Sequence, residues 1–412
     1  MSDMPAKGSL LVIFLTVFVD LLGFGIVLPL LPIYANQFTV DQAGWQLGML
    51  MASFSAMQFL VAPIWGRVSD HFGRRPVLLI GLLGSVVFYL LFGIATVWKS
   101  LALLFVSRIG AGVACATIPT AQAYIADSTS LANRPRGMAL IGMAFGLGFT
   151  FGPLFGFLAA PHRHADPGPW PGYVAAMLSG AAFLMAWFLL PESRRAGSEP
   201  AARRTLDWRS WHEALATPSV GLLLLTTFVC MFSFAKFETT LSLLISERGT
   251  GPGPFRFSWG QVCLTYAYIG FLLALVQGGL VRRLALRMNE GFLASFGAFV
   301  EIVGFALVIA AIGKSSPTLL FVSLAVVVAG YSFMQPTLQS LISRRSDPAR
   351  QGMVLGVAQS VSSLARILGS AVGIPILRIH VAAPYYVAAA LMALALVLVV
   401  AASRSGRDFA AE

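Results

Sequence analysis

Apolar stretches of roughly twenty residues recur along the whole chain, and they limit what it can fold into more than any other feature. About 20 apolar residues in a helix are needed to cross about 30 Å of hydrocarbon. We find twelve such stretches, approximately at residues 10–35, 46–65, 77–97, 101–125, 137–159, 172–190, 217–246, 260–281, 292–312, 318–342, 352–378 and 384–403. With 57% hydrophobic and 11% charged residues, the composition does not fit a soluble domain. The sequence predicts an all-α membrane protein with twelve transmembrane helices.

Positive charge is distributed unevenly over the loops between these stretches. Most of the 28 Lys and Arg residues fall in segments that are cytoplasmic if the N-terminus is cytoplasmic. The positive-inside rule therefore predicts that both termini are cytoplasmic, and it accounts for the net charge of +11 without a nucleic-acid partner. The first stretch lacks a small-residue cleavage site before Asn36, so we expect a retained helix, not a removed signal peptide.

The chain divides near its middle, where residues 191–216 form the longest polar segment. Similar sequences flank it: LLFVSRIGAG at 103–112 is echoed by LLFVSLAVVVAG at 319–330, and TFGPLFG at 150–156 by ILGSAVG at 367–373. We therefore predict two pseudo-symmetric six-helix bundles, 1–190 and 217–412, joined by a cytoplasmic linker at 191–216, with a site between them near the bilayer midplane. Residues 206–215 could form a short amphipathic helix in that linker, although a plain tether is an equally good interpretation.

Six ionisable side chains lie inside these apolar stretches: Asp20, Arg108, Lys236, Glu238, Glu301 and Arg366. Each costs about 2.5 to 3.5 kcal/mol at a helix centre on insertion scales, so their presence indicates a path for protons, ions or a polar solute. Burial favours the neutral form of a carboxyl group and a nearby cation favours the charged form. Asp20 with Arg108, and Glu301 with Arg366, are candidate pairs, although buried pairs can also be purely structural. Lys236 and Glu238 are two residues apart, so on a helix they point to different faces.

A compact charged motif, GRVSDHFGRRP at 66–76, separates the second and third stretches. We expect it to form a short loop in which Gly66 and Gly73 permit a tight turn and close helix approach. Asp70 is a candidate partner for Arg74 or a helix N-terminus, Arg75 adds positive charge, and Asp127 at the inner end of the fourth stretch is a further partner for Arg74. Such a cluster could latch one conformation of a two-state protein, while topogenic charge alone is the simpler alternative.

These motifs resemble those of the major facilitator superfamily, and the neighbouring helices narrow the likeness to drug and proton antiporters. Asp20 with Pro29 and Pro32 is similar to the first-helix signature of that branch. The segment RIGAG at 108–112 with AYIAD at 123–127 resembles its fourth helix. The antiporter motif of its fifth helix is matched by Gly148, Gly152, Pro153 and Gly156. Bacterial tetracycline efflux pumps resemble the chain over essentially its whole length, more strongly in the first half.

The resemblance implies a secondary transporter in which Asp20, Glu301 and Arg108 couple substrate movement to protons. It implies that helices one, four, seven and ten line the substrate path, which gives the candidate cavity residues Phe24, Gln122, Phe234, Glu238, Tyr331, Gln335 and Gln339. Their aromatic and amide groups suit an amphipathic organic solute. Arg366 is a further candidate cavity residue that is not part of the family pattern, and it could neutralise Glu301 or select an anionic or zwitterionic substrate.

Three departures from the pumps bear on the substrate. His71 stands where Arg or Lys is usual, Phe157 replaces a second glycine after Gly156, and Phe88 occupies the place of an acidic residue in the third helix. Tetracycline is therefore in doubt as the substrate, although Glu301 falls where those pumps place an essential ninth-helix aspartate.

The leading hypothesis is a proton-coupled exporter of amphipathic small molecules, acting as a monomer in a bacterial cytoplasmic membrane and performing no covalent chemistry. The sequence has no GxxxxGK[ST] phosphate-binding loop and no metal-ligand spacing around Cys115, Cys230 and Cys263, so we expect no cofactor and no metal. A lipid or lysolipid exporter, a proton symporter, and a non-transporting membrane receptor are the alternatives.

Overall fold

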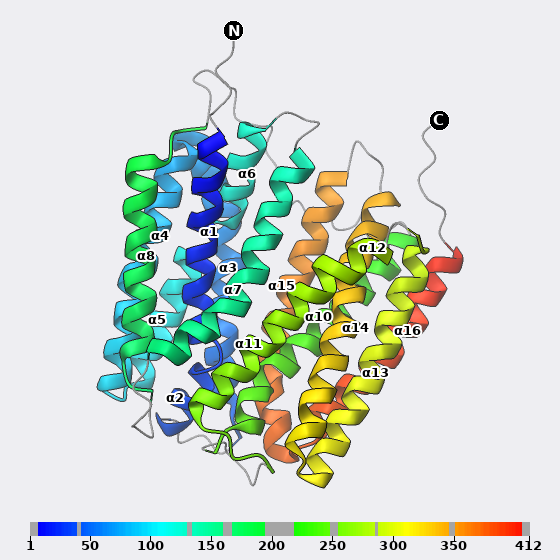
Figure 1. Ribbon diagram of the computed structural model, residues 1–412. Helices are drawn as coiled ribbons and strands as arrows, with labels where there is room; N and C mark the ends of the chain where they lie inside the picture. The colour runs from blue at the N-terminus through cyan, green and yellow to red at the C-terminus, as the bar shows by residue number, and fades with distance from the viewer. Residues whose placement is uncertain are drawn as a thin grey trace, which may run out of the picture. The chain divides into compact units, whose positions relative to one another are not determined.

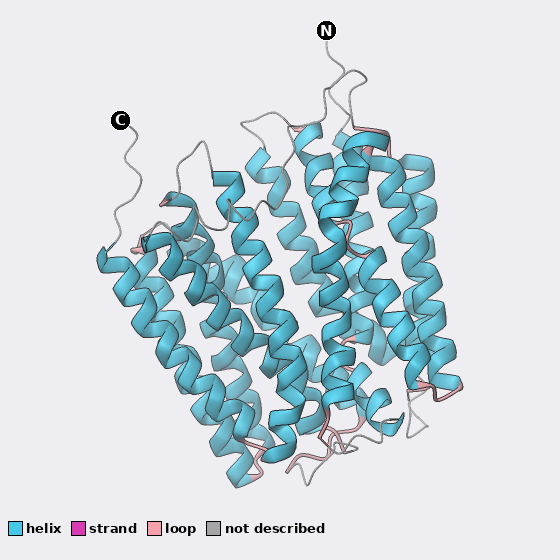
Figure 2. Ribbon diagram, turned by 180° about the vertical axis from the view of Figure 1, so that it is seen from behind, coloured by secondary structure: helices cyan, strands magenta, loops and turns pink. Residues whose placement is uncertain are grey.

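The protein is almost entirely helical in the computed structural model, which describes residues 7–38, 43–129, 134–159, 167–193, 218–247, 254–284, 287–345 and 351–405. Figure 2 shows helices through most of the described residues, in which the only β-type pairing is an isolated bridge between Ser246 and Phe257. The predicted all-α class is confirmed. The proposed amphipathic helix at 206–215 lies outside the described residues.

The first half contains eight helices among the described residues, coloured blue to green in Figure 1. They are α1 (Lys7–Val27), α2 (Leu31–Phe38), α3 (Trp45–Phe72), α4 (Arg74–Val97), α5 (Leu101–Ala114), α6 (Ile118–Ser128), α7 (Arg134–Ala159) and α8 (Trp170–Leu189). Those of the second half are α10 (Pro218–Ile245), α11 (Trp259–Leu275) with the π-helical η1 (Val276–Val281) and α12 (Arg282–Leu284), α13 (Glu290–Lys314), α14 (Pro317–Arg344), α15 (Gln351–Ile379) and α16 (Ala383–Ser405).

Eleven spans within the described residues are long and apolar enough to cross a membrane, and the shorter apolar helix Met143–Ala159 lies within α7. Each of the twelve predicted stretches therefore corresponds to a helix or to a broken helix. The chain is a multi-pass membrane protein.

Two of the predicted stretches are not continuous helices. The first is interrupted at residues 28–30, between α1 and α2, and the fourth at residues 115–117, between α5 and α6. Proline explains both breaks, because it has no N–H to donate and its ring clashes with the carbonyl four residues earlier. Pro29 lies inside the first break, and Pro119 lies in the first turn of α6.

The chain forms two compact units, each described here by itself. The first comprises Met1–Thr39, Ser53–Arg204 and Ser258–Gly270, and the second comprises Val40–Ala52, Thr205–Phe257 and Phe271–Glu412. The predicted domain boundaries at 190 and 217 stay a prediction, because the units exchange short segments and the linker lies largely outside the described residues.

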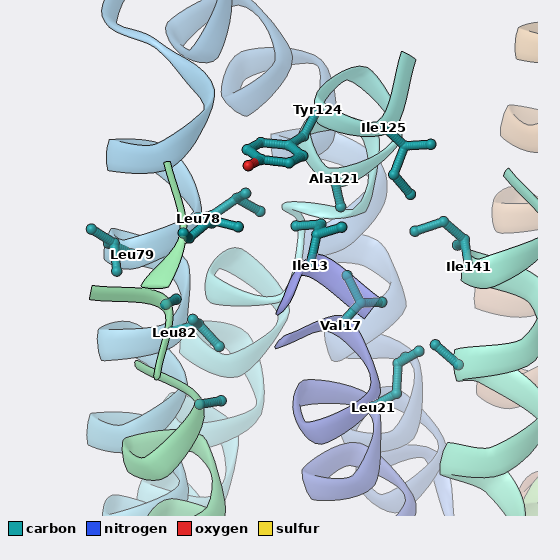
Figure 3. Packing of buried hydrophobic residues seen from close by; sticks show 14 residues of the cluster. Ile13, Val17, Leu21, Leu78, Leu79, Leu82, Ala121, Tyr124, Ile125 and Ile141 are labelled. Carbon is teal, nitrogen blue, oxygen red and sulfur yellow. The ribbon is translucent and has the colours of Figure 1, made fainter. Parts of the chain in front are cut away.

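One buried apolar cluster of the first unit holds α1 against α4, α6 and α7 (Figure 3). Ile13, Val17 and Leu21 follow each other at four-residue intervals and so line one side of α1. In Figure 3, Tyr124 of α6 lies above Ile13, and its hydroxyl donates to the carbonyl of Pro191 over 3.0 Å. This cluster fixes the rotation of α1, and with it the position of Asp20.

The antiporter-motif glycines bring α7 into close contact with α1. A Cβ added at Gly25 would lie 2.6 Å from the carbonyl oxygen of Gly148, and one added at Gly152 would lie 2.6 Å from Cα of Gly25. Only glycine permits backbones to approach this closely in a membrane helix pair. Gly156 lies against Ile26 and Pro153 lies inside α7, so the motif packs α7 closely onto α1 within the first unit.

The internal repeat appears as matching contacts within the two units. Lys99 and Ser315 both end a helix with a positive φ, 50° and 51°, and the next residues, Ser100 and Ser316, both cap the following helix over 3.4 Å. A Cβ at Gly81 would meet the carbonyl oxygen of Ala114 at 2.9 Å, and one at Gly297 would meet that of Gly330 at 2.8 Å. The similarity between 103–112 and 319–330 therefore reflects a repeated helix pair.

Candidate functional site

Asp20 of α1 is held by two neutral donors. The hydroxyl of Ser85, on α4, donates to Asp20 Oδ1 over 2.8 Å. The thiol of Cys115, at the break between α5 and α6, lies 3.7 Å from the same oxygen and 3.6 Å from the Ser85 hydroxyl. A carboxyl group with these partners can gain or lose a proton without breaking an ion pair.

Arg108 is not the partner of Asp20, which corrects the expected pair. Arg108 is 2% exposed, and its guanidinium carbon lies 4.5 Å from the ring centroid of Phe54 and 5.8 Å from that of Phe24. Its Nε and Nη1 have no hydrogen-bond partner among the described residues. Burial of α5 against α3 directs the side chain onto aromatic faces, where a cation–π interaction contributes about 0.5 to 2 kcal/mol.

Phe88, which stands in place of an acidic residue, fills a packing role in the structure. A Cβ at Gly110 would overlap its ring, so Phe88 packs tightly onto the backbone of α5.

Glu301 lies at the closest contact between α13 and α14. It is 1% exposed, and a Cβ at Gly330 would fall 2.6 Å from its Cγ. Within the described part of the chain, its Oε1 accepts no hydrogen bond. Glu301 is therefore buried at a helix contact with one carboxyl oxygen unpartnered, which costs free energy in a low dielectric.

Arg366 pairs with Glu238, not with the expected Glu301. Arg366 Nη1 on α15 lies 4.0 Å from Glu238 Oε2 on α10, and its Nη2 lies 3.9 Å from Sδ of Met231. The hydroxyl of Tyr331, on α14, also lies 3.9 Å from that sulfur, and its ring stacks on Phe234 with centroids 3.7 Å apart. Four of the predicted cavity residues of the second unit therefore meet in one cluster.

Lys236 is buried on a different side of α10 from Glu238, as the sequence spacing predicts. It is 0% exposed and packs against α15, where a Cβ at Gly373 would lie 3.1 Å from its Cγ. Its Nζ lies 5.7 Å from the Phe232 ring centroid and has no hydrogen-bond partner among the described residues.

The predicted amide residues do not join these clusters. Gln122 of α6 and Gln339 of α14 are exposed, and Gln335 is partly buried. Phe24 is buried and stacks on Phe54 with centroids 4.7 Å apart.

The charged motif at 66–76 is helical except for Gly73, which corrects the expected loop. Helix α3 continues to Phe72 and α4 begins at Arg74, so Gly73 alone turns the chain, with a φ of 102° that favours glycine. Gly66 lies inside α3 with nothing within 4 Å of an added Cβ, so the close approach expected there is absent.

Arg74 joins three elements at this end of the first unit. Its Nη1 donates to Asp70 Oδ1 over 2.5 Å and to the Ser69 hydroxyl over 2.8 Å, and its Nε donates to Asp127 Oδ2 over 3.1 Å. The expected contacts of Arg74 with Asp70 and Asp127 are confirmed.

Glu192 completes this cluster, although the sequence did not lead us to predict it. Its carboxylate accepts from the backbone N–H groups of Arg74 and Arg75 over 2.9 and 3.1 Å, and so satisfies donors at the start of α4. Arg75 Nη2 also donates to the carbonyl of Trp187 over 2.6 Å. The acidic residue directly after Pro191, at the end of an apolar stretch, was the available signal.

The second unit carries a matching ion pair with the charges reversed. Glu290 at the start of α13 lies 3.6 Å from Arg344 at the end of α14, and it accepts from the Ser340 hydroxyl over 2.6 Å. In the repeat, α13 corresponds to α4, and the end of α14 corresponds to α6. Glu290 therefore occupies the place of Arg74, and Arg344 occupies the place of Asp127.

A multi-pass helical architecture, an internal repeat and ionisable groups inside membrane-length helices are typical of membrane transporters. The family model described as Major Facilitator Superfamily matches residues 13–370. The chain belongs to this superfamily.

Individual relatives agree with that assignment. The chain is 31% identical over 368 residues to the class C tetracycline resistance protein of Escherichia coli, covering 89% of each chain. It is similar to the crystal structure of the human organic anion transporter MFSD10, with a TM-score of 0.70, 26% identity, and coverage of 96% of this chain and 99% of the other. A crystal structure of a D-xylose–proton symporter matches with a TM-score of 0.76 at 16% identity, which shows the fold alone.

Proposed function

We propose that this transporter exports amphipathic small molecules in exchange for protons. The observation that carries the proposal is Asp20, a carboxyl group in a membrane helix whose hydrogen-bond partners are the neutral side chains of Ser85 and Cys115. An acid in this setting loads a proton in one conformation and releases it in the other. Glu301, buried between α13 and α14, is proposed as the second acid.

The chemistry of the two acids suggests how coupling works. Protonation removes a charge that is costly to desolvate, so it favours a conformation in which the acid is closed off from water. Deprotonation favours the conformation in which water reaches it. Alternating access then follows when substrate binding shifts the same equilibrium between the two conformations.

The cluster of Asp70, Arg74, Asp127 and Glu192 is proposed to stabilise one of the two conformations. Its bonds join α3, α4, α6 and the segment after α8, so movement of these elements must break several of them together. A two-state element of this kind gives discrete conformations.

The relatives support the substrate class. One is named as a tetracycline resistance protein and another as an organic anion transporter, and both names refer to organic molecules. The charge distribution over the loops supports the proposal that both termini are cytoplasmic. The proposal of a monomer in the bacterial cytoplasmic membrane comes from the family resemblance alone. We expect no covalent chemistry.

Proton movement in proteoliposomes tests the proposal. The probes are tetracycline and three naphthalene compounds of similar size: naphthylmethanesulfonate, naphthylmethyltrimethylammonium and naphthylethanol. At least one probe is expected to drive proton movement in the wild type, with loss of that movement in Asp20→Asn and Glu301→Gln. The control Glu247→Gln removes an exposed carboxylate beyond the end of α10 and is expected to behave like the wild type.

Two results would overturn the proposal. One is the absence of proton movement with every probe. The other is probe-driven proton movement that persists at the wild-type rate in both Asp20→Asn and Glu301→Gln.

A further inference from the structure

Two sides of α10 carry different chemistry. Phe232, Lys236 and Thr240 follow at four-residue intervals, and the Cβ contacts of Gly369 and Gly373 place this side against α15. Met231, Phe234 and Glu238 are spaced by three and four residues and form the other side. The side chains of Arg366 and Tyr331 approach this second side.

The ion pair on this side is loose. The 4.0 Å between Arg366 Nη1 and Glu238 Oε2 is well beyond the roughly 2.7 to 2.9 Å of a charge-assisted hydrogen bond. The other close approach, Arg366 Nη2 to the sulfur of Met231 at 3.9 Å, involves only a weak acceptor. Arg366 therefore attracts Glu238 electrostatically while retaining donors in the fork geometry that suits an anion.

Arg366 is more exposed than the buried cations Arg108 and Lys236. Its side chain is 28% exposed and that of Glu238 is 12% exposed, whereas Lys236 is closed off completely. A purely structural pair in a membrane helix is expected to be tightly bonded and buried, because each unmet donor there costs free energy.

A stacked aromatic pair adjoins the charge, with Tyr331 buried and Phe234 partly exposed. Phe234 and Tyr331 stack nearly parallel, with 15° between their planes, and the Tyr331 hydroxyl approaches the same Met231 sulfur as Arg366. The stacked rings of Phe234 and Tyr331, the flexible thioether of Met231 and the partly exposed guanidinium of Arg366 together suit one kind of ligand. That ligand is a flat apolar molecule that carries a negative group.

We propose that Arg366 binds an anionic group of the substrate and that Glu238 competes with the substrate for Arg366. The inference rests on the proposed function and deepens it, because it makes the substrate an aromatic organic anion or zwitterion. Binding replaces the long contact with Glu238 by short charge-assisted hydrogen bonds to the substrate anion. When the substrate leaves, Glu238 again provides the counter-charge for Arg366, so the guanidinium is never left without an anion nearby.

Equilibrium binding to the full-length protein in lipid nanodiscs tests the inference, with titration calorimetry as the readout. Naphthylmethanesulfonate is expected to bind more tightly than naphthylmethyltrimethylammonium. Arg366→Gln should weaken sulfonate binding about tenfold or more, since hydrogen bonds to charged groups contribute about 1.5 to 3 kcal/mol. Arg366→Lys should retain part of the affinity, and Glu238→Gln should strengthen sulfonate binding because the competitor is removed.

Two controls separate recognition from folding. Lys314→Gln removes one positive charge at an exposed position at the end of α13 and should leave sulfonate affinity unchanged. The double variant Arg366→Gln with Glu238→Gln leaves no unpaired charge and should still lack the preference for the sulfonate.

Sulfonate affinity within twofold of the wild type in Arg366→Gln would overturn the inference. An equal loss of affinity for the sulfonate, ammonium and alcohol probes would also overturn it, because it would indicate a structural role. If the wild type moves protons with the ammonium probe but does not bind the sulfonate, the inference fails and the proposed function stands. If Arg366-dependent sulfonate binding occurs without proton movement for any probe, the inference stands and the proposed function fails.

Discussion

The contact between α13 and α14 leaves no room for a side chain at Gly330, which makes Gly330→Ala a sharp test of the structure. A Cβ there would lie 2.6 Å from Glu301 Cγ, 2.7 Å from Glu301 N and 2.7 Å from the Gly297 carbonyl oxygen. Carbon atoms in favourable contact are about 3.5 to 4.0 Å apart, so the helices must separate by about 1 Å. Two of the three atoms are backbone and cannot rotate away.

The magnitude follows from two opposing effects. Overpacking of this kind typically costs about 1 to 3 kcal/mol, and rigid backbone neighbours place Gly330 at the upper end. Alanine recovers about 1 kcal/mol of helix propensity relative to glycine. The net loss is therefore about 2 kcal/mol. At about 2 to 4 °C per kcal/mol for a unit of this size, Tm should fall by about 4 to 8 °C.

A fluorogenic thiol reagent provides the assay, since Cys115, Cys230 and Cys263 are free and buried and react only when the protein unfolds. Gly356→Ala is the matched control, because nothing lies within 4 Å of its added Cβ, and its Tm should stay the same or rise slightly. If Gly330→Ala and Gly356→Ala unfold at the same temperature, the packing described for α13 and α14 is wrong.

Two further predictions concern buried and exposed charge. Lys236→Met should raise Tm in the same assay by about 2 to 12 °C, because it removes an amine that has no partner among the described residues and whose burial costs about 1 to 3 kcal/mol; a lower Tm would contradict this. Arg74→Gln should slow probe-driven proton movement severalfold while lowering Tm by no more than about 8 °C, because its partners Asp70 and Asp127 are about one-third exposed and each of these two pairs contributes about 1 kcal/mol or less. Unchanged proton movement in Arg74→Gln would argue against a latch.

The sequence alone determined the number and placement of the membrane helices, and the fold class with them. Bilayer thickness sets the length of an apolar stretch, so hydropathy locates each span without knowledge of its neighbours. The repeat was also visible in the sequence, because residues 103–112 are echoed by residues 319–330. Ser100 and Ser316, just before these segments, make the same local cap in the structure. The contacts of Arg74 with Asp70 and Asp127 could be predicted because charges at the ends of helices have few partners within reach.

Only the tertiary structure decided which side chains meet between the helices. Asp20 bonds Ser85 and Cys115, not Arg108, and Arg366 pairs with Glu238, not Glu301. These helices are apolar on all sides, so no polar face in the sequence indicates how each is rotated about its axis. Rotation is set by close contacts at small residues, such as Gly25 against Gly148, which involve partners distant in the chain. An error of one residue in rotation turns a side chain by about 100°, enough to exchange one partner for another.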